Sequence, residues 1–142
     1  MNKFINVAVD QALKSTQSYR HGAILFKGGK VHASSFNDEN HAEIDCLYSL
    51  PRCKQVRQSR YNLLVVRVTR DGELTDSKPC LFCISHLRKS ERIKSICYST
   101  SDGKIVKESI NSITTDHIPK SARCFFRNGG TIREFKIQCC LD

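Results

Sequence analysis

The spacing of apolar positions changes along the chain, and each change marks a predicted element. From Lys3 to Ser15 the apolar side chains recur at helical spacing, which predicts a first helix. Two short apolar runs, 23–26 and 31–36, then flank Lys27-Gly28-Gly29-Lys30. Paired glycines readily adopt the positive φ angles of a tight hairpin turn, so these runs are predicted to form a β-hairpin.

The pattern continues as an alternation of helices and strands. A second helix is predicted from His41 to about Leu50, where Pro51 ends it. Residues 63–68 are almost continuously apolar and β-branched, as expected of a central strand covered on both faces. A third helix from Cys80 to about Lys89 and a strand from Ile93 to Tyr98 follow. This alternation predicts an α/β domain.

The direction of the next strand is less evident from the pattern. Residues 96–100 and 104–107 are separated by Ser101-Asp102-Gly103, and Asp-Gly between apolar runs predicts a hairpin of antiparallel strands. The alternative is a local turn before a helix at about 109–113. We interpret all 142 residues as one domain, in which 115–142 is an extension without a predicted place in the fold. Within it, 134–139 alternates as a half-buried strand would.

Two short motifs carry the chemistry. His41-Ala42-Glu43 is followed by Pro79-Cys80-Leu81-Phe82-Cys83, and H-x-E with P-C-x-x-C is the signature of zinc nucleobase deaminases. One imidazole and two thiolates on a tetrahedral Zn²⁺ leave the fourth position open for water, as in catalytic sites. Zinc lowers the pKa of that water towards about 7, which supplies a hydroxide for attack on the ring. Glu43, which is not a ligand, is predicted to be the proton shuttle.

Each motif alone has an ordinary interpretation. Asn40 to Glu43 also reads as a capping box, with Asn40 as the N-cap of a helix. A lone C-x-x-C pair also occurs in redox proteins and structural zinc sites. The spacing of Cys80 and Cys83 places both sulfurs on one face of a helical turn, and Pro79 suits a helix start, where the positive end of the dipole favours thiolates. Together, the motifs favour a catalytic zinc site.

These motifs resemble the cytidine and deoxycytidylate deaminase superfamily, which includes tRNA adenosine deaminases and polynucleotide cytidine deaminases. Residues 19–31 look like the first hairpin of that family, and the resemblance covers about residues 1–110. It implies a three-layer α/β/α fold around a mixed sheet of about five strands. It also implies that Asn37 contacts the substrate sugar and that the backbone around Gly22, Ala23 and Ala42 lines the base pocket.

Two features of the resemblance conflict over the substrate. An antiparallel final strand pair is typical of free cytidine deaminases. A helix leading to a parallel strand is typical of the tRNA, deoxycytidylate and polynucleotide enzymes. His41, however, stands where free cytidine deaminases generally have a third cysteine.

Charge favours a polyanionic substrate. The formal net charge is +9, and the first fifty residues balance, so the whole excess lies after Leu50. Such a basic region attracts nucleic acid at long range, although a solvated basic face that confers solubility is the ordinary alternative. The candidate nucleic-acid contacts are Arg52, Lys54, Arg57, Arg88, Arg123, Phe125 and Arg127. Phe125 interleaves with basic residues in the manner of single-strand binding surfaces, or belongs to the core.

The sequence therefore predicts a zinc-dependent hydrolase that converts cytosine to uracil on single-stranded nucleic acid, as in DNA or RNA editing. The alternatives are deamination of free cytidine, deoxycytidine or deoxycytidylate, deamination of tRNA adenosine, and a zinc-stabilised nucleic-acid-binding module without activity. The chain lacks the apolar run of a membrane span and the features of a signal peptide, so we expect a soluble intracellular protein with reduced cysteines. A homo-oligomer is compatible with the sequence.

Overall fold

A mixed sheet between helices organises the chain. The structure is a computed structural model that describes residues 1–51, 60–118, Arg127 and Gly129. Predictions for the residues between and beyond these, including the strand at 134–139, lie outside the described residues. The elements are α1 (Asn2–Ala12), β1 (Arg20–Lys27), β2 (Lys30–Phe36), α2 (Ala42–Tyr48), β3 (Tyr61–Val68), β4 (Leu74–Thr75), α3 (Leu81–Ser90), β5 (Ile93–Ser99) and β6 (Ile105–Ser109).

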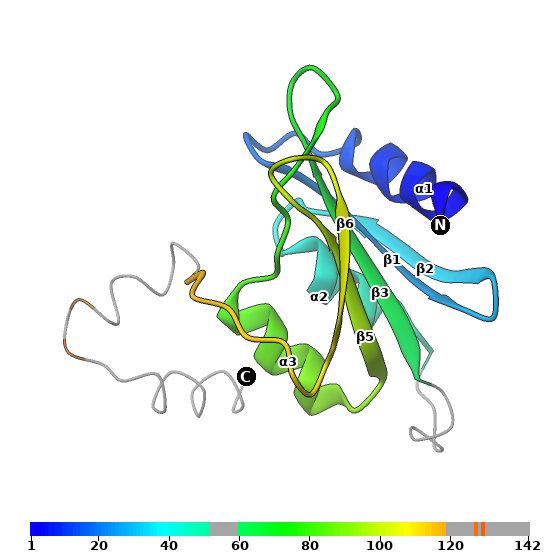
Figure 1. The fold of residues 1–142 in the computed structure, drawn as a ribbon, viewed down its shortest axis with the longest axis vertical. Coiled ribbons are helices and arrows are strands. Elements are labelled where there is room, and N and C mark those ends of the chain that lie inside the picture. Colours follow the sequence, from blue (N-terminus) through cyan, green and yellow to red (C-terminus); the bar gives the residue numbers. More distant parts are fainter. Residues whose placement is uncertain (52–59, 119–126, 128, 130–142) are drawn as a thin grey trace.

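The strands pair in the order β2-β1-β3-β5-β6, and β4 pairs with the end of β3. β3 and β5 are parallel, whereas all the other pairs are antiparallel. Helix α1 covers one face of the sheet, and α2 and α3 cover the other (Figure 1). The predicted three-layer α/β/α architecture around a mixed sheet is therefore confirmed for the described part of the chain.

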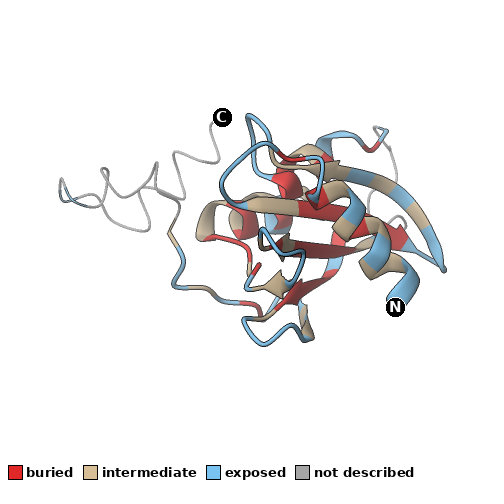
Figure 2. Cartoon of the chain, turned by 90° about the horizontal axis from the view of Figure 1, so that it is seen from above, coloured by how far each residue is buried: buried red, intermediate tan, exposed pale blue. Residues whose placement is uncertain are grey.

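Two apolar cores lie between the three layers. On the side of α2 and α3, Ala23, Leu25, Leu63 and Val65 are buried, and the residues between them along β1 and β3 are buried on the side of α1. The buried residues therefore concentrate within the sheet and on the helix faces that touch it (Figure 2). A strand with one exposed face alternates polar and apolar residues. β3 is covered on both faces, which explains why its residues form a continuous apolar run.

The predicted hairpins are both present. The turn between β1 and β2 has Gly28 and Gly29 at φ of 60° and 78°. β5 and β6 are antiparallel with Cys97 opposite Lys107, so the turn at Asp102-Gly103 reverses the chain as predicted. Residues 110–112 form a turn, and the alternative helix at 109–113 is wrong.

The sheet contains one strand that the pattern did not predict. β4 has only two residues, Leu74 and Thr75, which pair with Val68 and Arg67. Its sequence is too short to show a period, so only the pairing with β3 identifies it. The described sheet consequently has six strands instead of about five. No helix in the described part of the chain combines the length and the apolar character needed to cross a bilayer.

Gly22 fixes the distance between α1 and the sheet. A Cβ atom at this position would clash with the carbonyl oxygen of Ala8 and lie 2.6 Å from the amide nitrogen of Ala12. Both are backbone atoms of a packed helix, so they cannot yield as a flexible side chain would. The absence of a side chain at Gly22 therefore permits the close approach of helix and strand.

We expect Gly22→Ala to lower the free energy of unfolding by about 3 kcal/mol or more, because it overpacks a helix–strand contact made by backbone. Urea denaturation followed by circular dichroism measures the change. Gly29→Ala is the matched control: its Cβ would meet nothing within 4 Å, but its φ is +78°. Backbone strain alone should cost about 1–2 kcal/mol there. A smaller loss for Gly22→Ala than for Gly29→Ala would contradict the close-approach explanation.

Candidate metal centre

The start of α3 and the residue before α2 bring three potential metal ligands together. The ligand atoms of His41, Cys80 and Cys83 all lie within 4.8 Å of one another. The Nδ1 atom of His41 is 3.2 Å from the sulfur of Cys83 and 3.6 Å from that of Cys80. Bond lengths of about 2.1 and 2.3 Å on a tetrahedral zinc place nitrogen and sulfur about 3.6 Å apart, so this donor set fits Zn²⁺.

His41 presents its ring to the site because it stands at the N-cap of α2. Its backbone is extended, with φ −63° and ψ 142°, and its side chain makes no capping hydrogen bond. The capping box at Asn40 to Glu43 is therefore wrong: the Nδ2 atom of Asn40 donates instead to Asp45 at 3.2 Å. Because the His41 imidazole does not cap the helix, its ring nitrogens are available to bind a metal.

Cys80 and Cys83 lie at the N-cap and in the first turn of α3. The amide of Cys83 donates to the Cys80 sulfur at 3.5 Å, so the sulfur takes the place of the usual capping oxygen. Pro79 directly precedes the N-cap, as expected of a proline at a helix start. Helix α3 is further held by the amide of Leu81, which donates to the carbonyl of His117 at 2.9 Å.

The two thiols are unequal in acidity. The pKa of the Cys80 thiol is lowered well below its ordinary value, first by the hydrogen bond from the Cys83 side chain and also by His41. The pKa of Cys83 is raised for the converse reason, because it donates to Cys80 and is fully buried. The pKa of His41 is raised mainly by its bond with Cys80. A negative charge therefore accumulates at Cys80, which is what a divalent cation requires of its ligands.

Glu43 lies beside this group and is only 5% exposed. Burial raises the pKa of its carboxyl to about 7, and the negative charge of Cys80 adds to the effect. A carboxyl group with this pKa can gain and lose a proton near neutral pH, which suits general acid–base catalysis. Burial of an ionisable side chain is costly, so its place next to three candidate metal ligands makes Glu43 a candidate for acid–base chemistry.

The residues predicted to contact substrate occupy two kinds of position. The side chain of Asn37 accepts from the amide of His21 at 2.7 Å and donates to the carbonyl of Tyr19 at 2.6 Å. It thus holds the start of β1, and its contact with a sugar stays a prediction. Ala23 and Ala42 are fully buried on the side of α2, whereas Gly22 faces α1. From these three residues, only the backbone can line a pocket near the metal ligands.

Most of the predicted nucleic-acid contacts lie outside the described residues, namely Arg52, Lys54, Arg57, Arg123 and Phe125. Arg127 is exposed. Arg88 is engaged inside the fold, because its guanidinium donates to the carbonyl of Ile110 at 3.0 Å and to that of Ile113 at 2.8 Å. It holds the chain after β6 against α3, which is a structural role that its sequence position did not reveal.

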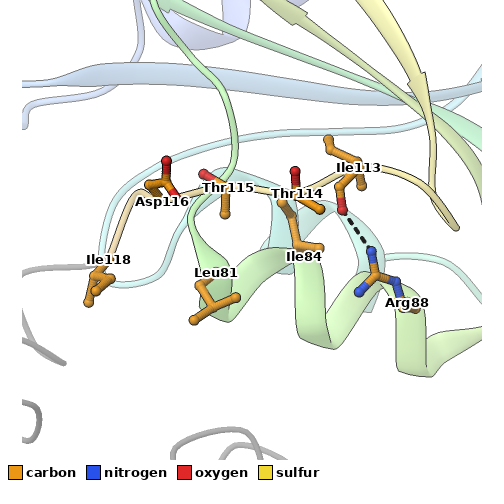
Figure 3. Close-up of a pocket in the computed structure, with 8 residues that line it drawn as sticks. All are labelled: Leu81, Ile84, Arg88, Ile113, Thr114, Thr115, Asp116 and Ile118. Atoms are coloured by element: carbon orange, nitrogen blue, oxygen red, sulfur yellow. Dashed lines mark hydrogen bonds between the residues drawn. The ribbon is translucent and has the colours of Figure 1, made fainter. Parts of the chain in front are cut away.

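A cavity of about 300 Å³ lies between α3 and the chain that follows β6 (Figure 3). Its wall is mainly apolar, with Arg88 and Asp116 as its charged residues. Leu81 reaches it directly after the metal-ligand candidate Cys80, but none of the three ligand candidates lines it. The lining residues are Leu81, Ile84, Arg88, Ile113, Thr114, Thr115, Asp116 and Ile118.

His21 is a neighbour of the site for which the sequence carries no motif. Burial, and then the charge of Arg67, lowers its pKa to about 4, and the charges of His41 and His117 act in the same direction. Residue His21 pairs with Arg67 across β1 and β3. It shares the α2 side of β1 with Ala23, two residues on. The alternation of side chains along β1 could have indicated the face on which His21 lies. It could not have shown that Arg67 of β3 stands opposite His21.

Comparisons with known proteins add a distant structural similarity. No protein family profile and no curated protein matches the sequence. Solved structures similar to this one include Acinetobacter baumannii RibD in form 2, at a TM-score of 0.48 and 17% identity, and in form 1, at a TM-score of 0.47 and 17% identity. In both, the match covers 70% of this chain and 26% of RibD. The chain thus matches about a quarter of the length of RibD.

We expect Cys80→Ser and Cys83→Ser to lose bound zinc and to unfold more readily, since metal binding and folding are coupled. Elemental analysis of purified protein should give about one zinc per chain for the wild type and far less for either variant. Cys97→Ala is the control, because Cys97 is buried in the opposite core, on the side of α1. Wild-type zinc content in either site variant would refute the assignment of the ligands.

A second expectation concerns pH. The pKa of His21 is about 4 in the fold against 6.5 for the ordinary side chain, so the unfolded chain binds more protons between these values. The stability from neutral His21 is therefore complete above pH 6.5 and is lost as pH falls towards 4. His21→Gln should reduce the loss of unfolding free energy between pH 7 and 4.5 by about 1–2 kcal/mol.

Urea denaturation at each pH, in the same zinc concentration, measures this loss. The control is His32→Gln, because His32 is an exposed residue of β2. Its curve should run parallel to that of the wild type. If the curve of His21→Gln is also parallel, His21 is not buried in its neutral form.

Proposed function

We propose that this chain is a zinc-dependent hydrolytic nucleobase deaminase that converts cytosine to uracil. The observation that carries the proposal is the meeting of His41, Cys80 and Cys83 within 4.8 Å, beside the buried carboxyl of Glu43. A structural zinc site uses four protein ligands, whereas the three candidates among the described residues leave a position for water. The non-ligand carboxyl at this position distinguishes a hydrolytic site from a scaffold.

Zinc, when bound, lowers the pKa of a water molecule and so makes a nucleophile available at neutral pH. The role of Glu43 is to carry protons in two steps: it moves the first proton of the water to the ring nitrogen, and then the second proton of the same water to the departing amine. The overall reaction consumes one water and releases ammonia. Because the pKa of Glu43 is raised to about 7, its protonated and ionised forms are both accessible under physiological conditions.

The proposed substrate is single-stranded nucleic acid, and the support for it is the excess of positive charge. Several basic side chains, from before and after Leu50, lie at the sheet edge away from the metal-ligand candidates, at the turn between β1 and β2 and the starts of β3 and β5. The cations there are Lys27, Lys30, Arg60, Arg92 and Lys94. At that edge they act on a polyanion at long range instead of touching the reacting base.

Free cytidine or deoxycytidine is the second candidate substrate. The antiparallel pairing of β5 and β6 favours it, because the sequence resemblance associates this arrangement with free cytidine deaminases. Deamination of tRNA adenosine remains a further hypothesis within the same chemistry. A nucleic-acid-binding module without activity is the alternative outside it.

We expect Glu43→Gln to abolish deamination while zinc stays bound, because the amide keeps the shape of the carboxyl but carries no transferable proton. The loss should be at least about 100-fold in kcat, as for other general acid–base residues. Mass spectrometry of the products from oligodeoxynucleotides, RNA, cytidine, deoxycytidine and their monophosphates measures it. Asp45→Asn, on the same helix, should retain activity as the matched control.

Each outcome of this assay selects one function. Uracil formed only in polymers supports the proposed substrate, and turnover of nucleosides supports the second candidate. Inosine in tRNA would identify adenine as the base. An inactive wild-type protein that binds both zinc and nucleic acid would favour the binding module, and full activity in Glu43→Gln would remove Glu43 from the mechanism.

A further inference from the structure

Arg67 is an unusual residue for its place in the sheet. β3 lies between β1 and β5, and its residues Leu63 and Val65 are fully buried on the side of α2 and α3. Arg67 is the next residue on that face, and the residues on either side of it, Val66 and Val68, are buried in the opposite core. A charge at the end of such a strand loses hydration, which is unfavourable unless the charge finds a partner.

The guanidinium of Arg67 has no such partner in the described part of the chain. The ion pair found there joins Lys78 and Glu108, and the neighbouring guanidinium of Arg20 donates to the carbonyl of Thr69 at 2.6 Å. The backbone amide of Arg67 donates to the hydroxyl of Ser99, and its guanidinium lies 4.3 Å from the centre of the Tyr19 ring, without a side-chain hydrogen bond to any described residue. Its side-chain N–H donors are therefore available to a ligand.

The pair formed by Arg67 and Tyr19 lies at the same sheet edge as the metal-ligand candidates. Arg67 pairs in register with His21, and the side chain of Asn37 binds the backbone of both His21 and Tyr19. His41 follows Asn37 by four residues. The start of β1 and the end of β3 thus border the approach to His41, on the face of the sheet that α2 covers.

The electrostatics agree with this placement. His21 has a pKa of about 4, lowered by burial and by Arg67, and it is neutral at pH 7. The charge of His41 also acts on it, so the three side chains share one region. At neutral pH, two arginines supply the positive charge between β1 and β3 at this edge: Arg20, whose guanidinium donates to the carbonyl of Thr69, and Arg67.

We propose that Arg67 and Tyr19 form a phosphate-binding subsite beside the metal centre, in which the guanidinium binds a phosphate of the substrate and the Tyr19 ring stacks on a neighbouring base. This inference rests on the proposed function and deepens it: the substrate is a nucleotide unit and not a free nucleoside. A guanidinium presents its donors as a planar fork that matches two phosphate oxygens. Tyr19 is 62% exposed, so its ring can contact a base.

The contact between Tyr19 and Arg67 also orients the Arg67 guanidinium before a phosphate binds. A guanidinium stacked on an aromatic ring is held in one orientation, so less side-chain freedom is lost when it binds phosphate. Asn37 donates to the backbone carbonyl of Tyr19 and so helps to hold Tyr19 in place beside Arg67. The phosphate can be a monoester, as in deoxycytidylate, or the diester of a nucleic-acid chain, and the test separates these two sources.

The experiment compares zinc-loaded wild type with Arg67→Gln on deoxycytidine, deoxycytidylate and a short oligodeoxynucleotide with one cytosine. Loss of a charge-assisted hydrogen bond should raise KM for the two phosphate-containing substrates about 10- to 100-fold. KM and kcat for deoxycytidine should stay within about twofold of the wild type, because that substrate has no phosphate for Arg67 to bind. Arg70→Gln is the matched control, as an exposed arginine three residues further along the chain.

Tyr19→Leu separates the two sources of phosphate. If the ring stacks on a neighbouring base, this change raises KM for the oligodeoxynucleotide and leaves deoxycytidylate unaffected. Equal effects on both substrates would refute stacking by Tyr19. Arg67→Lys, which keeps the charge but not the planar fork, should fall between the wild type and Arg67→Gln and provides a second variant if Arg67→Gln does not fold.

A binding measurement distinguishes failure of this subsite from failure of the proposed reaction. Fluorescence anisotropy of a labelled oligodeoxynucleotide is recorded with Glu43→Gln protein, with and without Arg67→Gln. Weaker binding on loss of Arg67, but not of Arg70, supports the subsite even if no substrate is deaminated. If Arg67→Gln matches Arg70→Gln in binding and in KM, or impairs deoxycytidine equally, the subsite is wrong while the deaminase proposal stands.

Discussion

The meeting of two helix starts at one edge of the sheet is the constraint on which the site depends. β3 and β5 are parallel, so the chain must cross over between them, and α3 makes that crossing. The crossover returns Cys80 and Cys83 to the edge where β3 ends, and the hairpin of β1 and β2 delivers His41 to the same edge. Neither helix could supply all three potential ligands alone.

The site concentrates groups that are costly to bury. Glu43 is almost completely inaccessible, Cys80 and Cys83 are buried, and Arg67 has no ion-pair partner in the described part of the chain. A bound divalent cation would compensate the thiolates, and a substrate phosphate would compensate the guanidinium. We therefore interpret this edge of the fold as organised for ligands, in contrast to the two apolar cores that stabilise the sheet.

Charge is also distributed between the two edges. At the metal edge, Asp38 and Glu39 precede His41, and Arg67 projects from the end of β3. Several of the described cations lie at the opposite edge, around Tyr61, whose ring is 5.7 Å from the guanidinium of Arg92 and 5.9 Å from the ammonium of Lys27. Net charge alone thus does not show where the cations lie, and few of the described ones lie near the metal-ligand candidates.

The sequence by itself predicted the class of fold, the candidate ligands His41, Cys80 and Cys83, and Glu43 as a candidate proton carrier. These depend on local patterns: His41 to Glu43 and Cys80 to Cys83 are close in sequence, and helical or alternating periods are visible within one element. The turn at Asp102-Gly103 could likewise be predicted, because the conformation of a hairpin turn depends on the residues within the turn. The capping box at Asn40 was wrong, because the N-cap is His41, one residue further on, and helix starts one residue apart have similar local energies.

Only the tertiary structure decided which residues stand opposite one another. The period of a strand shows that His21 and Arg67 each share a face with apolar neighbours, but not that β1 and β3 place them side by side next to His41. The use of Arg88 to hold the chain after β6, and the pairing of the two-residue β4, are equally non-local. The physical reason is that strand pairing joins segments far apart in sequence, and its register follows from the packing of both sheet faces.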